Sequence, residues 1–313
     1  MITDFTIKVP ATSANLGPGF DLLGMALDLY NDFHFSFSED SNYKISKEDG
    51  SPLPFVIKDN LIKLAYKKYA DIYLPNINLP PFNVRVNLNL PMRGGLGSSA
   101  SAIIAGFLTA KKYHDLEIKS IPLPNENSIL TELAMLEGHP DNTTPALLGG
   151  FVLSYFTKEG LIFFRKKFPK NIKLFLFIPE IETDTNDSRK KLPEVYTTQD
   201  IIFNMSRIST WGEFINTGNY NLLKICVEDK LHTPYRIENI PILKEISEIL
   251  LDNNICYTLS GSGPTLLIYV EEERAFNFNE EFHKIAKISL ERNLINYKFI
   301  PIETCETGTI IKN

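Results

Sequence analysis

A glycine-rich segment in the first third of the chain has the residue types that bind a phosphate group. It reads Pro91-Met92-Arg93-Gly94-Gly95-Leu96-Gly97-Ser98-Ser99-Ala100, follows an expected strand and leads into an expected helix. Glycines let the backbone approach a ligand closely, and the free N–H groups at the start of a helix favour an anion. The segment predicts a phosphate-binding loop, although an ordinary glycine turn with a serine N-cap has the same composition.

The segment differs from three well-known phosphate loops. No lysine follows its last glycine, as a Walker A loop requires, and the sequence has no HRD or DFG motif downstream, as a protein kinase requires. Its glycines fit the loose dinucleotide pattern, which also needs an acidic residue about 20 positions later at the end of a second strand. Asp115 has roughly that spacing but lies at the end of an expected helix. A dinucleotide-dependent oxidoreductase is therefore disfavoured.

The elements that must position this loop are a mixture of strands and helices. Alternation of apolar and polar residues predicts half-buried strands at 33–37 and 84–90. The other expected strands are 5–10, 173–178 and 265–270, and the expected helices are 60–70, 99–114, 126–137, 241–252 and 279–292. Because they do not alternate regularly, the α+β class is favoured over a doubly wound parallel sheet.

Composition excludes several classes of function. A length of 313 residues suggests about two domains. The net charge of -6 and the scattered basic residues argue against binding to nucleic acid or a membrane surface. No secretory signal or membrane span is evident, and three separated cysteines fit neither a disulfide framework nor a zinc site. We expect a cytoplasmic protein.

The glycine-rich segment resembles the ATP loop of the galactokinase, homoserine kinase, mevalonate kinase and phosphomevalonate kinase (GHMP) superfamily. Two further superfamily segments occur in the right order, PATSANLGPGFD at 10–21 and LSGSGPT at 259–265. The segments LEGHPDN at 136–142, TNDSR at 185–189 and DKLHTPYR at 229–236 are similar to those of homoserine kinases. The resemblance covers essentially the whole chain, and its three motifs together are highly specific.

The resemblance implies a two-domain GHMP kinase architecture. Residues 1–160 would form an N-terminal domain like ribosomal protein S5 that carries the ATP loop. Residues 161–313 would form a C-terminal ferredoxin-like α/β sandwich that carries the substrate-binding arginines and the Gly-Ser-Gly-Pro loop. The family also implies a homodimer.

An amino acid with a reactive hydroxyl offers a carboxylate, an ammonium group and the hydroxyl itself. Arginine binds a carboxylate through two parallel hydrogen bonds, aspartate suits the ammonium group, and asparagine can hold the hydroxyl. The resemblance places Arg189 and Arg236 on the carboxylate, Asp21 on the ammonium group, and Asn15 and Asn142 near the hydroxyl. It also places His139 and Asp141 in the same pocket.

The resemblance assigns the remaining site residues to ATP and Mg²⁺. The expected ATP-binding residues are Asn60, Leu61, Pro91, Met92, Arg93, Gly94, Gly95, Leu96, Gly97, Ser98, Ser99, Ala100, Gly261, Ser262 and Gly263. The expected metal ligands are Ser98 and Glu132, because Mg²⁺ prefers hard oxygen ligands. Glu137, five residues after Glu132, is the competing carboxylate.

The implied reaction is in-line attack of the L-homoserine hydroxyl on the γ-phosphoryl group of ATP, in the synthesis of threonine. We find no convincing general base, and the candidates for direct participation are Asn15, Asp21, Asn142 and Thr185. Two alternatives stay open: a GHMP kinase that acts on mevalonate or a sugar, and a non-catalytic sensor with the same fold. The C-terminal residues 305–308 depart from the family pattern, so a contact expected there is in doubt.

Overall fold

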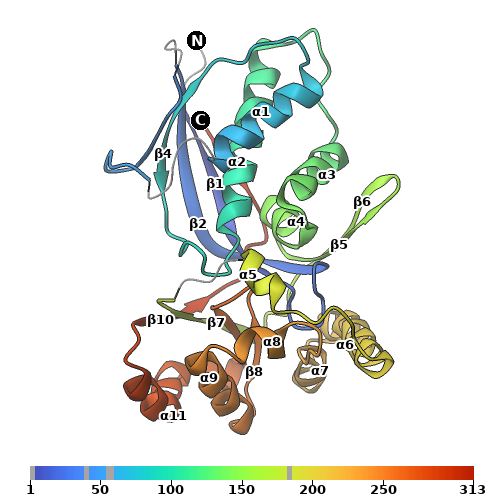
Figure 1. Ribbon diagram of the computed structural model, residues 1–313, viewed down its shortest axis with the longest axis vertical. Helices are drawn as coiled ribbons and strands as arrows, with labels where there is room; N and C mark the ends of the chain where they lie inside the picture. Colours follow the sequence, from blue (N-terminus) through green and yellow to red (C-terminus); the bar gives the residue numbers. More distant parts are fainter. Residues whose placement is uncertain (1–3, 39–41, 54–59, 182–184) are drawn as a thin grey trace.

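The computed structural model describes residues 4–38, 42–53, 60–181 and 185–313. Two sheets, each with its own helices, are stacked along the long axis of the molecule (Figure 1). The predicted α+β class is confirmed.

The larger sheet has the strand order β11-β1-β2-β4-β3, and β5 pairs with both β2 and β6. Its strands are β1 (Phe5–Ala14), β2 (Leu23–Phe37), β3 (Lys44–Lys47), β4 (Phe82–Asn87), β5 (Phe151–Thr157), β6 (Gly160–Lys166) and β11 (Ile310–Lys312). Every pairing that is described is antiparallel except β3 with β4. The C-terminal strand β11 therefore returns beside the N-terminal strand β1.

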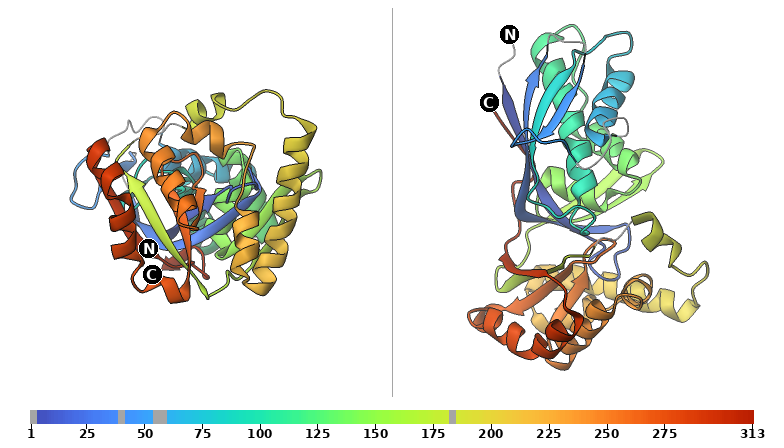
Figure 2. Two further views of the ribbon diagram at one scale, coloured as in Figure 1. Left: turned by 90° about the horizontal axis from the view of Figure 1, so that it is seen from below. Right: turned by 60° about the vertical axis from the view of Figure 1, so that its left-hand side comes forward.

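One face of the larger sheet is covered by helices (Figure 2). These are α1 (Leu61–Tyr73), α2 (Ser98–Glu117), α3 (Glu126–Glu137) and α4 (Pro140–Leu148). Alternate residues of the strands, such as Phe33 and Phe35, point into a core shared with α1 and α2. Gly106 allows these two helices to touch, since a Cβ there would lie 2.0 Å from the Ile62 carbonyl oxygen.

The smaller sheet is antiparallel, with the order β10-β7-β9-β8. Its strands are β7 (Ile172–Pro179), β8 (Cys256–Leu259), β9 (Leu266–Glu271) and β10 (Tyr297–Ile302). Phe175 and Phe177 pack toward α9 (Pro241–Asp252) and α11 (Phe278–Asn293). Leu174 and Leu176 share a core with α6 (Thr198–Thr217) and α7 (Tyr220–Cys226). Helices therefore lie on both faces of this sheet (Figure 2).

The two sheets share packed residues, which holds their loops in a defined arrangement. The core around Leu174 also contains Ala11 and Met25 from the larger sheet. Trp211 of α6 is buried in this core and donates its indole N–H to the carbonyl oxygen of Leu16, at 3.2 Å. Short helices α5 (Thr185–Lys190), α8 (Thr233–Ile237) and α10 (Glu272–Ala275) complete the described structure.

Each strand and helix expected from the sequence is found, with ends that differ by a few residues at most sites. The elements that were not expected include the β5–β6 hairpin, strands β8 and β10, helices α6 and α7, and several shorter strands and helices. The predicted division at residues 160 and 161 stays a prediction. Strand β6, which begins at Gly160, and strand β11 both belong to the larger sheet. Among the described residues, no helix combines the length and the apolar character needed to cross a membrane.

Candidate active site

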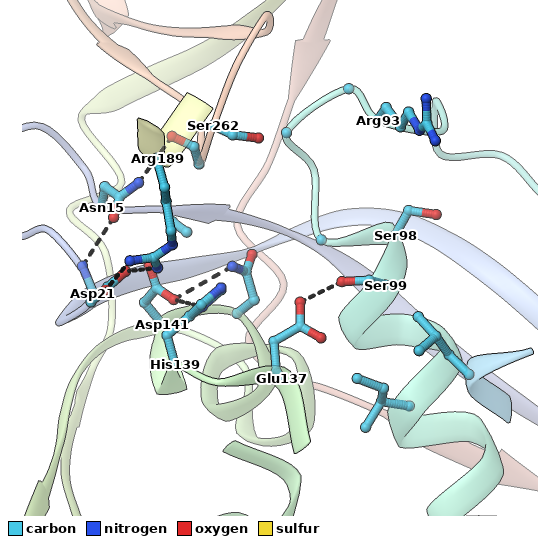
Figure 3. A pocket seen from close by; sticks show the side chains of 18 of the residues that line it. Asn15, Asp21, Arg93, Ser98, Ser99, Glu137, His139, Asp141, Arg189 and Ser262 are labelled. Atoms are coloured by element: carbon cyan, nitrogen blue, oxygen red, sulfur yellow. Dashed lines mark hydrogen bonds and ion pairs between the residues drawn. The ribbon is translucent and has the colours of Figure 1, made fainter. Parts of the chain in front are cut away.

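A cavity of about 500 Å³ lies where loops from the two sheets meet (Figure 3). Its walls come from the β1–β2 loop, the glycine-rich loop, the segment between α3 and α4, helices α5 and α8, and the β8–β9 loop. The predicted residues that line it are Asn15, Asp21, Leu61, Arg93, Gly94, Gly95, Gly97, Ser98, Ser99, His139, Asp141, Asn142, Arg189, Arg236, Gly261 and Ser262. Sequence positions almost 250 residues apart thus face one space.

The glycine-rich loop presents the start of helix α2 to this cavity. Gly97 is the N-cap residue, with a φ of 71°, and a Cβ there would lie 2.1 Å from the hydroxyl oxygen of Thr12. The neighbouring serines, Ser98 and Ser99, line the cavity. Because the first backbone N–H groups of a helix lack partners within the helix, this end can bind an anion such as a phosphate.

A second, more apolar cavity of about 370 Å³ adjoins the first and shares Leu61, Arg93, Ser98 and Ser99 with it. Its other walls include Phe33, Leu53, Asn60, Ile62, Val86, Leu88 and Met92. Asn60 also caps helix α1, since its side-chain oxygen accepts a hydrogen bond from the Ile62 N–H at 2.9 Å. The pair of cavities therefore suits a ligand with a flat apolar group, for the second cavity, joined to phosphate groups, for the first.

Four of the predicted ATP-binding residues lie outside the walls of both cavities. Pro91, Leu96 and Ala100 pack behind the glycine-rich loop, where Leu96 and Ala100 are buried. Gly263 lies in the β8–β9 loop, whose Ser260 hydroxyl donates to the Gly95 carbonyl oxygen at 2.6 Å. These residues shape the loop, whereas the ligand-facing surface comes from their neighbours.

The structure separates the two candidate metal carboxylates. Glu137 lines the cavity and accepts a hydrogen bond from the Ser99 hydroxyl (Figure 3). Partial burial raises the pKa of its carboxyl, although Ser99 opposes the shift. Glu132 lies toward α1, where burial and the Glu132 charge raise the pKa of Tyr73 to about 12. Five residues span about 500° of helix rotation, so the two side chains face different directions. Glu137 is therefore the carboxylate that faces the cavity, and the choice between Glu132 and Glu137 as the metal ligand stays a prediction.

Asp21 and Arg189 form a two-pronged ion pair at the edge of the cavity (Figure 3). The two guanidinium nitrogens lie 3.0 and 2.6 Å from the two carboxylate oxygens. Burial alone would lower the pKa of Arg189, but Asp21 raises it above its usual value. Asn15 supports this pair, since its side-chain oxygen accepts the backbone N–H of Asp21 and its amide donates to the Gly261 carbonyl.

His139 and Asp141 form a second charged pair beside the first. The His139 Nδ1 atom lies 2.6 Å from an Asp141 carboxylate oxygen. Burial alone would lower the pKa of His139, but this carboxylate raises it above the usual value. Asn142 continues the network, because its side-chain oxygen accepts the Thr12 hydroxyl at 2.7 Å. Asp21, His139 and Asp141 bring three potential ligand atoms within 4.8 Å of one another.

Arg236 reaches the cavity from helix α8 and is only 3% exposed. Its Nη1 atom donates to the Gly261 carbonyl oxygen at 2.9 Å. Burial lowers the pKa of Arg236 to about 10, so the guanidinium remains charged at neutral pH. Its Nε atom is buried and has no hydrogen-bond partner among the described residues. The predicted arginine is therefore present as a buried cation that faces the cavity.

His232 and Asp229 support Arg236 and were not assigned a role from the sequence. The His232 Nδ1 atom lies 3.3 Å from Arg236 Nη1, and its Nε2 atom lies 2.7 Å from the Gly17 carbonyl oxygen. Asp229 accepts the backbone N–H groups of residues 231, 232 and 233 and so fixes the start of α8. The only sequence signal was the spacing of His232, four residues before Arg236 on one helical turn.

Thr185 is the one predicted site residue whose side-chain position the structure does not describe. It begins helix α5, but its side chain lies outside the residues whose side chains the structure describes. Its proposed participation in catalysis stays a prediction.

The buried position of His232 predicts a pH-dependent stability. Burial lowers its pKa despite the adjacent Asp229, and the Arg236 charge also disfavours protonation. The unfolded chain has a histidine pKa of about 6.5, so it binds a proton that the folded chain excludes. We therefore expect the contribution of His232 to the free energy of unfolding to be present above pH ~6.5 and lost below it.

Denaturant unfolding of the wild type and a His232→Gln variant at pH 5, 6, 7 and 8 checks this expectation. The difference between the two free energies of unfolding should shrink as the pH falls. The difference is the diagnostic quantity, because His139, with its raised pKa, changes both proteins in the opposite direction. Two parallel curves would contradict the prediction.

The sequence is also similar to those of known proteins. Residues 60–150 match the N-terminal domain of the GHMP kinases. The chain is 37% identical over 295 residues to a homoserine kinase of Helicobacter hepaticus, covering 91% of this chain and 96% of that protein. It is 33% identical over 312 residues to a homoserine kinase of Clostridium botulinum, covering 98% of each.

Solved structures confirm the predicted GHMP architecture. A homoserine kinase from Cytophaga hutchinsonii superposes with a TM-score of 0.82 at 22% identity, over 99% of this chain and 98% of that one. A mevalonate kinase superposes with a TM-score of 0.65 at 17% identity, over 96% and 99%. These two similarities show the fold. The homoserine kinases of Helicobacter hepaticus and Clostridium botulinum, at 37% and 33% identity, show the family: the chain belongs to the homoserine kinase family of the GHMP kinases.

Proposed function

We propose that the chain transfers the γ-phosphoryl group of ATP to the side-chain hydroxyl of L-homoserine. The supporting observation is the set of charged and polar groups that line one cavity. A helix N-terminus suited to phosphate, a buried cation at Arg236, and the adjacent opposite charges of Arg189 and Asp21 face the same space. The carboxylate and ammonium groups of an α-amino acid need partners of these kinds.

ATP would bind across the two adjoining cavities. The apolar walls around Phe33 and Leu88 suit the adenine ring, and the start of α2 suits the phosphates. The carboxylate of Glu137 and the hydroxyl of Ser98 face the cavity, and such hard oxygen donors fit Mg²⁺. When bound, Mg²⁺ would supply positive charge that offsets the negative charge of the phosphates.

The protein would act chiefly by positioning and by charge stabilisation. The Asp21 carboxylate is already engaged by Arg189, and the Asp141 carboxylate is already engaged by His139, so neither is free to take the hydroxyl proton. Among the described residues that line the cavity, none is a lysine that could activate an aspartate. We infer that the hydroxyl proton passes to the phosphoryl group itself, as phosphoryl transfer with little covalent participation by the protein allows.

The test is ADP release by the purified protein with ATP and Mg²⁺, offered L-homoserine, L-serine, L-threonine, mevalonate and galactose separately. We expect strong turnover with L-homoserine alone. Turnover with mevalonate or galactose instead would show that Asp21 does not bind a substrate ammonium group and that the assignment of Arg189 to an amino-acid carboxylate is wrong. ATP binding without turnover of any compound would support the non-catalytic sensor. Sedimentation of the same sample tests the predicted homodimer, and localisation in cells tests the predicted cytoplasmic location.

A further inference from the structure

Two of the residues proposed to bind opposite ends of the substrate are bound to each other. Arg189, proposed for the carboxylate, holds both oxygens of Asp21, proposed for the ammonium group. The two side chains are 37% and 32% exposed and face the cavity, where a ligand can reach both (Figure 3). Without a ligand, each of these charges is therefore neutralised by the other.

The geometry of an α-amino acid explains why these residues lie so close. Its carboxylate and ammonium groups are attached to the same carbon atom, so their protein partners must also be neighbours. Neighbouring groups of opposite charge attract each other when no ligand separates them. A zwitterion can enter by exchange: its carboxylate takes Arg189 and its ammonium group takes Asp21. Both protein charges remain paired after the exchange.

A ligand with only one charge cannot complete this exchange. A carboxylate that takes Arg189 leaves the Asp21 carboxylate without its partner, and an ammonium group that takes Asp21 leaves Arg189 without its partner. A charged group that loses its hydrogen-bond partner in a partly buried site disfavours the complex. Arg236 is not part of the exchange, because it is held by the Gly261 carbonyl and His232.

We propose that the Asp21–Arg189 ion pair makes the cavity selective for ligands that carry a carboxylate and an ammonium group on the same carbon. The inference rests on the proposed function and deepens it, because it assigns the rejection of singly charged alcohols to this pair. Each residue then has two roles: it binds one end of the substrate, and it competes against ligands that lack the other end.

The test uses L-homoserine and two analogues that each lack one charged group. 4-Hydroxybutanoate has no ammonium group, and 3-aminopropan-1-ol has no carboxylate. Their dissociation constants are measured by calorimetry on the wild type and on Asp21→Asn and Arg189→Met variants, together with ADP release. Asp21→Asn should weaken L-homoserine binding by about tenfold or more and strengthen 4-hydroxybutanoate binding severalfold, because Arg189 is released. Arg189→Met should strengthen 3-aminopropan-1-ol binding in the same way.

An Asp141→Asn variant is the matched control for a general charge effect. Asp141 is a carboxylate of the same cluster, but its partner is His139 and not Arg189. If the ion pair is the cause, Asp141→Asn should not improve 4-hydroxybutanoate binding as Asp21→Asn does. An equal gain in both variants, or no gain in Asp21→Asn and Arg189→Met, would overturn the inference.

The wild type separates this inference from the proposed function. If the wild type does not turn over L-homoserine, the proposed function fails. If it does, and the two variants fail to gain affinity for the singly charged analogues, only the selectivity inference fails. Circular dichroism checks that each variant is folded, and the Arg189→Met arm keeps the test decisive if Asp21→Asn does not fold.

Discussion

Arg236→Ala is expected to reduce kcat/KM for L-homoserine by roughly 30-fold to several-thousand-fold. Loss of one partner from a buried charged pair costs about 2–5 kcal/mol, and each 1.4 kcal/mol is about tenfold in affinity. Arg236 is buried, remains charged and faces the cavity, so its loss removes a desolvated cation from the carboxylate site. Steady-state kinetics with varied L-homoserine at saturating ATP measures the loss.

ATP binding distinguishes a substrate contact from a structural role for Arg236. Arg236 reaches the cavity from helix α8, whereas the anion site is the start of helix α2, so ATP affinity should stay within about threefold of the wild type. Arg274→Ala is the matched control, since Arg274 pairs with Glu281 outside the cavity. Its kinetics should be close to those of the wild type. An equal loss of ATP affinity and L-homoserine use in Arg236→Ala would show that Arg236 is structural.

Glu137→Gln is expected to lower kcat by about 100-fold or more, because a metal ion contributes several kcal/mol of charge stabilisation to the transition state. The glutamine keeps the size of the side chain and a hydrogen-bond acceptor for Ser99 but removes the negative charge that would hold Mg²⁺. The Mg²⁺ concentration that gives half-maximal activity should therefore rise in this variant. Titration of ADP release with Mg²⁺ measures both effects.

Glu132→Gln provides the control on the same helix. It makes the identical chemical change on a face of helix α3 that does not line the cavity. Its kcat and Mg²⁺ dependence should therefore resemble those of the wild type. The opposite ranking, with a larger loss in Glu132→Gln, would restore Glu132 as the metal carboxylate and refute the placement of Glu137.

Elements with a clear local pattern could be predicted from the sequence. Helices α3 and α9 have the bounds that apolar spacing indicates, and strand β9 differs by one residue at each end. The apolar residues of α9, including Ile242, Ile246 and Leu250, form one buried stripe. Helix α6 has no comparable stripe, because Ile201, Ile202 and Met205 are exposed and only a few residues of the helix are buried. Periodicity alone therefore does not reveal it.

The residue types at the site were also available from the sequence, because each follows from local chemistry. A glycine at 97 is required by the positive φ and the close approach of Thr12, and the helix after it must begin with free N–H groups. The arginines, aspartates and asparagines of the other motifs supply the charges that an amino acid needs. These features depend on short segments, so they can be recognised without knowledge of the fold.

The pairing of those groups was decided only by the tertiary structure. Whether Glu132 or Glu137 faces the cavity depends on how helix α3 is rotated against its neighbours. The ion pair of Asp21 with Arg189 joins the β1–β2 loop of the larger sheet to helix α5, which follows β7 of the smaller sheet. The contact of His232 with the Gly17 carbonyl likewise depends on the packing of α8 against the β1–β2 loop. Sequence spacing specifies which groups are present, whereas distances between segments far apart in the chain arise from the packing of the two sheets into one shared core.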